Sequence, residues 1–461
     1  MEFLDREREL AVLREHLTRR GSGMFILYGR RRIGKTALLQ EVLRTLPRAA
    51  YHVATRSTIL EELKRLSTTI ADGWQVPFLS AQPLASSAAL LAFLEGARDP
   101  SVLVLDEFPF LVESDPSLPG LIQASWDRSL ANGGLKLVFC GSSVGLMEET
   151  FLSSRAPLFG RRTGQLMLGP LAPGHLRRAF DWDFPEIIEL FALFGGVPGY
   201  LSRLDAGLGI ETNLLRHVLA PGEPLYEEVP FLLREELREP RVYFAILATI
   251  AMGSQKFGEI SSKAGLDRAN LTRYLSTLID LGLVAREVPI TERMPEKSRK
   301  GLYRIADPFI ATWFRVVHPF RDQLERGLAR EVMRKAVKPA LSSHLPHAVE
   351  PVVREILRSG EPYVPIPFTP AHFGRYWSET AELDVVVMDI ERTRAFVAEI
   401  KWGRNPVSPS LLGSLLGRVK AERAFEGVEI TPCLISRAGF SQSVGRARCP
   451  DGVLIDVRRL R

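Results

Sequence analysis

At 461 residues the chain is too long for a single hydrophobic core, and at roughly 100–200 residues per domain it predicts about three domains. Hydrophobic residues make up 46% of it and charged residues 25%, which is ordinary for a soluble globular protein. The 60 basic and 54 acidic residues leave a net charge of +6, which permits a nucleic-acid partner without requiring one.

The N-terminus, the apolar segments and the cysteines each exclude a class of protein. The opening stretch MEFLDREREL is charged from its second residue, so we expect no secretory signal there. No uninterrupted apolar run is long enough to span a bilayer, which predicts no membrane partner. Cys140, Cys433 and Cys449 are too few and too scattered for a disulfide framework or a thiolate metal site. We therefore expect a cytoplasmic protein whose thiols serve packing.

The first two hundred residues alternate strand-like and helical patterns. The runs MFILYG, SVLVLDEF and KLVFCG are apolar on both faces, as strands buried in a parallel sheet are, and helical segments such as KTALLQEVLRTL lie between them. This alternation predicts an α/β P-loop NTPase core with a parallel sheet over residues 1–205. The pattern then becomes helical, with a break at PGEP, and predicts a helical lid over residues 206–239.

A phosphate-binding loop is predicted where the first strand meets the helix that follows it. The segment GRRRIGKT fits G-x-x-x-x-G-K-[ST], in which backbone N–H groups wrap the β-phosphate, Lys35 reaches the β- and γ-oxygens and Thr36 offers its hydroxyl to Mg²⁺. The predicted nucleotide contacts are Gly29, Arg30, Arg31, Arg32, Ile33, Gly34, Lys35, Thr36 and Ala37. We expect the three loop arginines to face solvent or a neighbouring domain.

Two adjacent carboxylates end the strand VLVLDEF. Asp106 is the second predicted Mg²⁺ ligand, and Glu107 is predicted to polarise the attacking water. After the next strand, Ser142 and Ser143 either sense the γ-phosphate or form a simple turn, and their spacing fits both. Arg161 and Arg162, in APLFGRR, either supply an arginine finger or form a surface pair.

The order FLDREREL, GRRRIGKT, LDEF, FCGSS, APLFGRR and GGVPGYL resembles the archaeal-type ATPases of the STAND/AAA-like P-loop group, over residues 1 to about 240. The resemblance implies that the nucleotide is ATP and that it is hydrolysed with Mg²⁺. It also implies that Arg161 acts on the nucleotide, that Pro198 packs near the adenine and that Arg6 lies close by. Whether Arg161 acts within one subunit or between subunits of a homo-oligomer stays open.

Residues 240–318 predict a winged helix-turn-helix that contacts DNA. YFAILATIA, KFGEISSKAG and DRANLTRYLSTLIDLG are three helical patterns, and LVAREVPI and GLYRIADPF are strands on either side of the basic tip TERMPEKSRK. The predicted DNA contacts are Arg268, Asn270, Thr272 and Arg273 on the recognition helix, and Lys297, Arg299 and Lys300 on the wing. A winged helix that acts as a lever or a protein-binding module is the alternative.

The last strand-rich segment carries a candidate metal site. The strands ELDVVV and FVAEIKW are joined by a short hairpin, which brings Asp384 beside Glu399 and places Lys401 on the same face as Glu399. The two carboxylates and the carbonyl of Ile400 form an oxygen-lined site for Mg²⁺, where Lys401 would steady a scissile phosphate. Glu350, on an upstream amphipathic helix, supports this hypothesis, and an ordinary exposed hairpin is the alternative.

This arrangement resembles the PD-(D/E)xK restriction-endonuclease-like fold over residues 346–461, with a connecting helix expected over residues 319–345. The resemblance implies a small α/β domain with Mg²⁺-dependent nuclease activity. The Pro-Asp half of the motif is absent, since Leu383 precedes Asp384.

Two functions fit these motifs. The first is a DNA-directed ATPase and nuclease, in which ATP binding moves domains, the winged helix holds DNA and the C-terminal site cuts it. The second is a signalling or regulatory ATPase of the STAND kind, whose C-terminal domain binds nucleic acid or a partner without cleaving. A processive helicase fits less well, because one P-loop core would then have to work as a ring or trimer.

Overall fold

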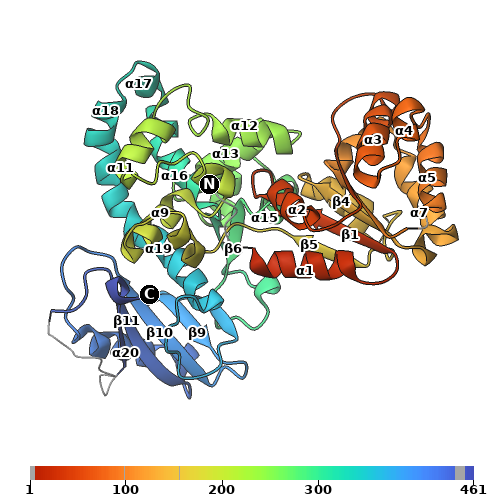
Figure 1. Cartoon of the computed structure of the whole chain (residues 1–461). Coiled ribbons are helices and arrows are strands. Elements are labelled where there is room, and N and C mark those ends of the chain that lie inside the picture. The colour runs from red at the N-terminus through yellow and green to blue at the C-terminus, as the bar shows by residue number, and fades with distance from the viewer. Residues whose placement is uncertain (1–5, 98, 155, 442–451, 461) are drawn as a thin grey trace. The chain divides into compact units, whose positions relative to one another are not determined.

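The computed structural model describes residues 6–97, 99–154, 156–441 and 452–460. The chain divides into two compact units, an N-terminal unit of residues 2–170 and a C-terminal unit that comprises residues 171–461. Figure 1 labels many of their helices and strands, and each unit is described by itself.

The N-terminal unit is built on a parallel five-stranded sheet in the order β2-β3-β4-β1-β5. Its strands are β1 (Gly23–Tyr28), β2 (Ala49–Val53), β3 (Ser101–Asp106), β4 (Leu135–Gly141) and β5 (Gly164–Met167). All residues of β1, β3 and β4 are buried, because these three strands occupy the centre of the sheet. The predicted P-loop NTPase sheet is confirmed, and the predicted central strands lie where the sequence indicated.

Helices enclose this sheet and gather beside it (Figure 1). They are α1 (Glu7–Thr18), α2 (Lys35–Leu43), α3 (Ile59–Trp74), α4 (Phe78–Ala81), α5 (Ser87–Gly96), α6 (Phe108–Ser114), α7 (Leu118–Arg128) and α8 (Val144–Met147). Phe108, Phe139 and Phe151 are fully buried with ring centroids 4.7–5.5 Å apart, and they fill the core on one side of β4.

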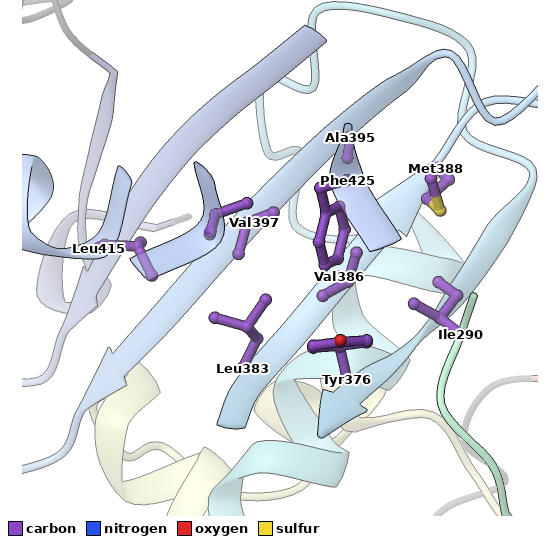
Figure 2. Close-up of a cluster of buried hydrophobic side chains, with 10 residues drawn as sticks. Ile290, Tyr376, Leu383, Val386, Met388, Ala395, Val397, Leu415 and Phe425 are labelled. Carbon is purple, nitrogen blue, oxygen red and sulfur yellow. The ribbon is translucent and has the colours of Figure 1, made fainter. Parts of the chain in front are cut away.

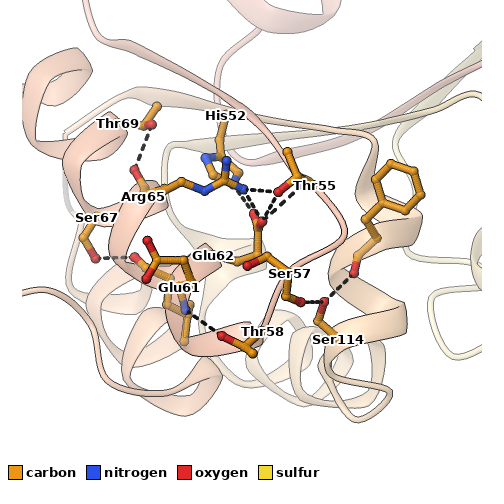
Figure 3. A network of polar contacts seen from close by, with 12 residues as sticks. His52, Thr55, Ser57, Thr58, Glu61, Glu62, Arg65, Ser67, Thr69 and Ser114 are labelled. Carbon is orange, nitrogen blue, oxygen red and sulfur yellow. Dashed lines mark hydrogen bonds and ion pairs between the residues drawn. The ribbon is translucent and has the colours of Figure 1, made fainter.

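Glu62, on α3, is the centre of a polar network inside this unit (Figure 3). Its carboxylate accepts hydrogen bonds from the backbone N–H of Thr55 at 3.2 Å and from the Thr55 hydroxyl at 2.8 Å. It also contacts His52 Nε2 at 3.1 Å and pairs with the guanidinium of Arg65. A fully buried carboxylate is stable only with such partners, so the network anchors α3 to the end of β2, beside the end of β3.

The C-terminal unit begins with helices. They are α9 (Phe184–Phe194), α10 (Pro198–Leu201), α11 (Ile210–Asn213) and α12 (Glu228–Glu236). Helix α9 starts with a capping box between Asp183 and Glu186, and nine of its eleven residues are buried. It is therefore the central helix of the segment rather than a surface helix.

The predicted winged helix-turn-helix is confirmed. Its elements are α13 (Pro240–Ala251), α14 (Phe257–Ala264), α15 (Arg268–Asp280), β6 (Val284–Glu287) and β7 (Leu302–Ile305). Gly265 ends α14 with φ 66°, and the Asp267 side chain caps α15 by accepting a hydrogen bond from the N–H of Asn270 at 3.0 Å. Antiparallel pairing of β6 with β7 forms the wing.

The expectation of a single connecting helix over residues 319–345 is wrong. After α16 (Pro308–Val316), the chain forms α17 (Arg321–Glu325), α18 (Ala329–Val332) and then the long α19 (Lys338–Ser359). Gly327, with φ 80°, separates α17 from α18, because its N–H bonds back to Leu324 in a left-handed cap. Helix α19 continues through the boundary expected at 345/346 into the predicted small domain.

A second, mixed five-stranded sheet follows, in the order β12-β11-β10-β9-β8. Its strands are β8 (His372–Trp377), β9 (Glu382–Met388), β10 (Arg394–Lys401), β11 (Glu429–Ser436) and β12 (Val453–Asp456), with α20 (Leu411–Ala421) between β10 and β11. Strands β8, β9 and β10 are antiparallel neighbours, whereas β10, β11 and β12 run parallel. The predicted small α/β domain is thus confirmed as a mixed-sheet domain.

One apolar cluster shows that this sheet and the wing share a core (Figure 2). Ile290, which follows β6, packs with Tyr376, Val386 and Phe425 of the C-terminal sheet domain. The backbone N–H of Ile290 donates to the carbonyl of Arg375 on β8 at 2.9 Å. The winged helix is therefore anchored to the C-terminal domain by packing and by backbone pairing.

The buried thiols bear out the packing role expected for them. Cys140 and Cys433 are buried and unbridged, and burial raises the pKa of each thiol well above its ordinary value. Cys449 lies outside the described residues.

Candidate functional site

The phosphate-binding loop runs from β1 to the start of α2. Gly29, with φ 149°, must be a glycine, because a Cβ there would lie 2.4 Å from the carbonyl oxygen of Leu168. Gly34 starts α2 with φ 97°. The ammonium of Lys35 is buried and donates to the carbonyls of Gly29 at 2.8 Å and Arg30 at 3.1 Å. The loop therefore curls around its own lysine, as a cradle for phosphate does.

Arg6 fixes this loop from the N-terminal side. Its guanidinium donates to the carbonyl of Ile33 at 3.2 Å and to that of Gly169 at 2.6 Å, and the residue is buried. Among the loop arginines, Arg30 is buried and Arg32 is exposed. The expected solvent-facing position thus fits Arg32 but not Arg30.

The two adjacent acidic residues at the end of β3, Asp106 and Glu107, are held in different ways. The Asp106 carboxylate accepts a hydrogen bond from Thr36 Oγ1 at 3.1 Å, so the two predicted Mg²⁺ ligands lie together. Glu107 has φ 53°, a strained left-handed conformation that turns it out of the strand. Its carboxylate accepts hydrogen bonds from Ser142 Oγ at 2.8 and 3.0 Å. Ser142 therefore contacts the predicted base rather than forming a simple turn.

Tyr51, on β2, is a site residue that the sequence reasoning missed. Its hydroxyl donates to the same Asp106 oxygen that Thr36 contacts. Burial and the adjacent carboxylate raise the pKa of Tyr51, so the phenol stays protonated and remains a donor. The only signal in the sequence was the position of AAYHV between two helical patterns, because a lone tyrosine in a strand carries no motif.

Of the three residues assigned by resemblance, Arg161 and Pro198 lie in different units. Arg161 is in the N-terminal unit, where it donates to both oxygens of Asp127 at 2.8 and 2.7 Å. It would have to leave that partner to act on a nucleotide. Pro198 is the first residue of α10 in the C-terminal unit.

The predicted DNA contacts fall into two groups. Asn270, Thr272, Arg273 and Lys300 have partners within the protein, namely Asp267, the carbonyl of Arg268, Glu239 and Glu292 respectively. Arg268 lies over the ring of Phe257, at 5.6 Å from its centroid, and Lys297 and Arg299 are exposed on the wing. The second group is the one that keeps its charge available to a ligand.

The predicted hairpin brings Asp384, near the start of β9, together with Glu399, near the end of β10. Asp384 Oδ2 accepts a hydrogen bond from the N–H of Ile400 at 3.0 Å. Burial raises the pKa of Asp384, and the negative charge of Glu399 raises it further. Glu399 forms ion pairs with both Lys401 and Arg418, so its charge is already compensated.

Glu350, on α19, belongs to the same cluster. Burial and the charge of Asp384 raise the pKa of Glu350 to about 7, and His347 Nδ1 lies 3.0 Å from its carboxylate. Arg354, one turn further along α19, donates to the backbone carbonyl of Asp384 at 2.8 Å. Within the described ranges, no three His, Cys, Asp or Glu side chains gather closely enough to hold a metal ion. Any metal here would rest on two carboxylates and backbone oxygen, which is the set that the sequence predicted.

Arg354 and Arg375 form a second feature that no sequence motif indicated. Both contact the carboxylate of Glu287, from the wing, at 3.2 and 2.8 Å, and Arg304 contacts it at 2.6 Å. Burial alone would raise its pKa, but the three guanidinium groups outweigh that effect and lower the pKa of Glu287 to about 2. This network ties the wing to α19 and β8.

Comparison with protein families assigns the ATPase and helix-turn-helix regions. Residues 3–204 match a family described as an ATPase domain predominantly from Archaea, and residues 243–287 match the IclR helix-turn-helix domain. Residues 313–410 match a family of archaeal and bacterial proteins of unknown function. The class defined by fold and site is therefore an archaeal-type ATPase with an attached helix-turn-helix.

Individual proteins are also similar to this chain. The uncharacterized protein MJECL04 of Methanocaldococcus jannaschii is 32% identical over 410 residues, which is 87% of each chain. The chain belongs to the same protein family as this relative. The Walker-type ATPase PABY2304 of Pyrococcus abyssi is similar in structure, with a TM-score of 0.52, 24% identity, and coverage of 68% of this chain and 97% of that one. This likeness concerns the fold.

The structure of the ORC2 protein of Aeropyrum pernix is more distant, with a TM-score of 0.42 and 16% identity over 72% of this chain and 96% of that one.

Across the described residues, each helix is too short or too polar to cross a bilayer.

Proposed function

We propose that the protein is an ATP-hydrolysing, DNA-associated protein in which the P-loop site drives changes in a winged helix and its attached C-terminal domain. The observation that carries the ATPase part is the convergence of Lys35, Thr36, Asp106 and Glu107 at one end of the parallel sheet. They supply a cation (Lys35), two oxygen ligands (Thr36 and Asp106) and a base (Glu107), which are the groups that phosphoryl transfer to water requires.

The residues of the site fit ATP and Mg²⁺. The Thr36 hydroxyl and the Asp106 carboxylate, 3.1 Å apart, are hard oxygen donors that would hold Mg²⁺. Bound there, the ion would neutralise charge on the β- and γ-phosphates. Lys35 would exchange its loop carbonyls for phosphate oxygens. Glu107, oriented by Ser142, would hold the attacking water. Arg161, released from Asp127, would add positive charge, from its own subunit or from a neighbour in a homo-oligomer.

DNA is the proposed partner of the winged helix. The match to the IclR helix-turn-helix domain and the uncompensated charges of Arg268, Lys297 and Arg299 support this part. The joint core of wing and C-terminal sheet means that DNA held by the winged helix is also held in a fixed relation to the Asp384 cluster.

A second candidate function is Mg²⁺-dependent DNA cleavage at that cluster. The observation that favours it is the placement of Asp384 beside Glu399, with Lys401 in contact with Glu399 and Glu350 within electrostatic reach of Asp384. The pairing of Glu399 with two cations supports the competing proposal, a regulatory ATPase of the STAND kind whose C-terminal domain binds without cutting.

One experiment separates these proposals. Purified protein is incubated with linear, circular, branched and single-stranded DNA and Mg²⁺ or Mn²⁺, with and without ATP, beside Asp384→Ala and Lys35→Ala. Cleavage that is lost in Asp384→Ala supports the nuclease, and its loss in Lys35→Ala shows that ATP licenses the cut. ATP hydrolysis and DNA binding with no cleavage of any substrate leave the regulatory ATPase. Absence of hydrolysis in the unaltered protein contradicts the proposed function.

A further inference from the structure

A cavity of about 640 Å³ lies in the winged helix, between the start of the recognition helix and the base of the wing. Its lining includes three arginines, Arg268 on α15, Arg286 on β6 and Arg299 in the wing loop. Two aromatic residues, Phe257 and Tyr303, complete the wall, with ring centroids 6.3 Å apart. Elements distant in the sequence thus place three guanidinium groups around one hollow.

The described residues do not neutralise the charge of these arginines. No carboxylate of the described residues pairs with any of the three, and the cavity wall contains no acidic side chain. Arg286 donates only to backbone carbonyls, those of Pro295 at 2.8 Å and Ser298. Like charges around one cavity repel one another, so an anion bound among them is stabilised.

The middle arginine is held in place before any ligand arrives. Arg286 is half-buried, and its guanidinium lies against Gly301, where a Cβ would come within 2.5 Å of Nε. A glycine at 301 is therefore needed for this position of the side chain. A guanidinium fixed in this way presents a planar set of donors that matches phosphate oxygens, with little entropy left to lose.

Two neighbouring basic residues of the domain differ from these three. Arg273 pairs with Glu239, and Lys300 pairs with Glu292 at 2.9 Å. The cavity arginines thus differ from these two paired neighbours, which supports a site rather than a general positive field.

We propose that this cavity is a phosphate-binding site that takes a backbone phosphate of a nucleic acid. Arg268 and Arg299 contact the phosphate oxygens, Arg286 orients the group from below, and Phe257 offers an apolar wall to the attached sugar. The proposal rests on the proposed DNA association. A free nucleotide carries the same phosphate chemistry, so the test distinguishes the two sources.

The test measures the affinity of the full chain for a labelled DNA duplex by fluorescence anisotropy over a range of salt concentrations. Arg268→Gln and Arg299→Gln remove charge from the cavity, and Arg273→Gln and Lys300→Gln are matched controls on the same two elements. Each cavity variant is expected to bind about five- to tenfold more weakly and to reduce the slope of log affinity against log salt by about 1. The controls are expected to change affinity by less than about twofold.

Each other outcome has a definite meaning. If all four variants weaken binding equally, the effect is that of a general basic surface and the cavity proposal is overturned. If the unaltered protein binds DNA and the cavity variants keep its affinity and slope, the proposal fails while the DNA association stands.

If the unaltered protein binds no DNA, the DNA part of the proposed function fails instead. Titration of Lys35→Ala protein with pyrophosphate then decides, because that variant lacks the P-loop lysine. If pyrophosphate gives binding heat with the Lys35→Ala protein and the additional substitution Arg268→Gln abolishes that heat, the cavity is assigned to free phosphates. If pyrophosphate gives no binding heat, the proposed site is overturned.

Discussion

The nucleotide site and the C-terminal carboxylate cluster use the same types of side chain but hold their charges differently. Lys35 is held by backbone carbonyls, and Asp106 by the hydroxyls of Thr36 and Tyr51, so neither charge is cancelled by an opposite one in these contacts. In the cluster, Glu399 pairs with two cations, and the pKa of Glu350 is raised to about 7. Neighbouring carboxylates alone therefore do not define a metal site, because their counter-charges decide whether a cation is needed.

The largest effect is expected at Glu107. Glu107→Gln should reduce the turnover of ATP by about 10²–10⁴-fold while ATP binding persists, because the amide cannot accept the proton of the attacking water. Turnover and nucleotide affinity are measured on the same preparation. Glu113→Gln, an exposed residue on the following helix, is the matched control and should retain full turnover. Equal turnover in both variants would remove Glu107 from the proposed mechanism.

The next effect concerns the network that joins the wing to the C-terminal domain. Glu287→Gln should destabilise the C-terminal unit by about 3 kcal/mol at neutral pH, because it leaves buried Arg354 and half-buried Arg304 and Arg375 without this carboxylate. The pKa of Glu287, about 2, lies below its ordinary value of 4.5. The stabilisation is therefore present at neutral pH and is lost as the pH falls from about 4.5 towards 2.

Denaturant unfolding at several pH values measures this difference. The gap between Glu287→Gln and the unaltered protein should narrow on acidification, and Glu382→Gln, a more exposed partner of Arg375, should show little effect at any pH. A gap that stays constant with pH would mean that the ion pairs are not its source.

A smaller effect is expected at Tyr51. Tyr51→Phe removes the hydrogen bond that orients Asp106, at a cost of about 1 kcal/mol, and should raise the Mg²⁺ concentration for half-maximal ATP turnover about fivefold. Turnover at saturating Mg²⁺ should change little. Tyr226→Phe, in the C-terminal unit, is the control. A loss of turnover that excess Mg²⁺ does not restore would contradict an orienting role.

The smallest effect is expected at Glu399, in the C-terminal carboxylate cluster. Arg418→Gln removes one of the two cations that pair with Glu399. The Arg418–Glu399 ion pair is largely solvent-exposed and contributes less than about 1 kcal/mol, so its loss should raise the affinity of the C-terminal unit for Mn²⁺ only a few-fold. Electron paramagnetic resonance of Mn²⁺, in a Lys35→Ala background, measures it. Arg423→Gln, just beyond the same helix, is the control. Unchanged Mn²⁺ affinity would indicate that Glu399 serves only as an ion-pair partner.

The parts of the fold that were predictable have a local cause. Strands β1, β3 and β4 are buried on both faces, so each forms a continuous apolar run that the sequence displays. Strands β2 and β5 lie at the edges of the sheet and mix buried with more accessible residues, so their patterns are short and ambiguous. The break at Gly327 was missed because a helix-ending glycine is evident only when its neighbours are known.

The site divides in the same way. The P-loop is contiguous and its geometry follows from eight consecutive residues, so its members were named from sequence. Tyr51, Arg286 and Glu287 act through partners far away in the chain, at Asp106, Gly301 and Arg354 respectively. Such contacts are created by tertiary packing and leave no pattern in the sequence.

In the proposed function, a Mg²⁺-dependent ATPase at Lys35 is linked to DNA held by the winged helix. The most direct measurement is ATP turnover by the unaltered protein and by Lys35→Ala, each with and without duplex DNA at fixed Mg²⁺. Turnover should require Lys35 and should change when DNA is added. Turnover that persists in Lys35→Ala would contradict the nucleotide site, and turnover that is indifferent to DNA at concentrations that saturate binding would contradict the link.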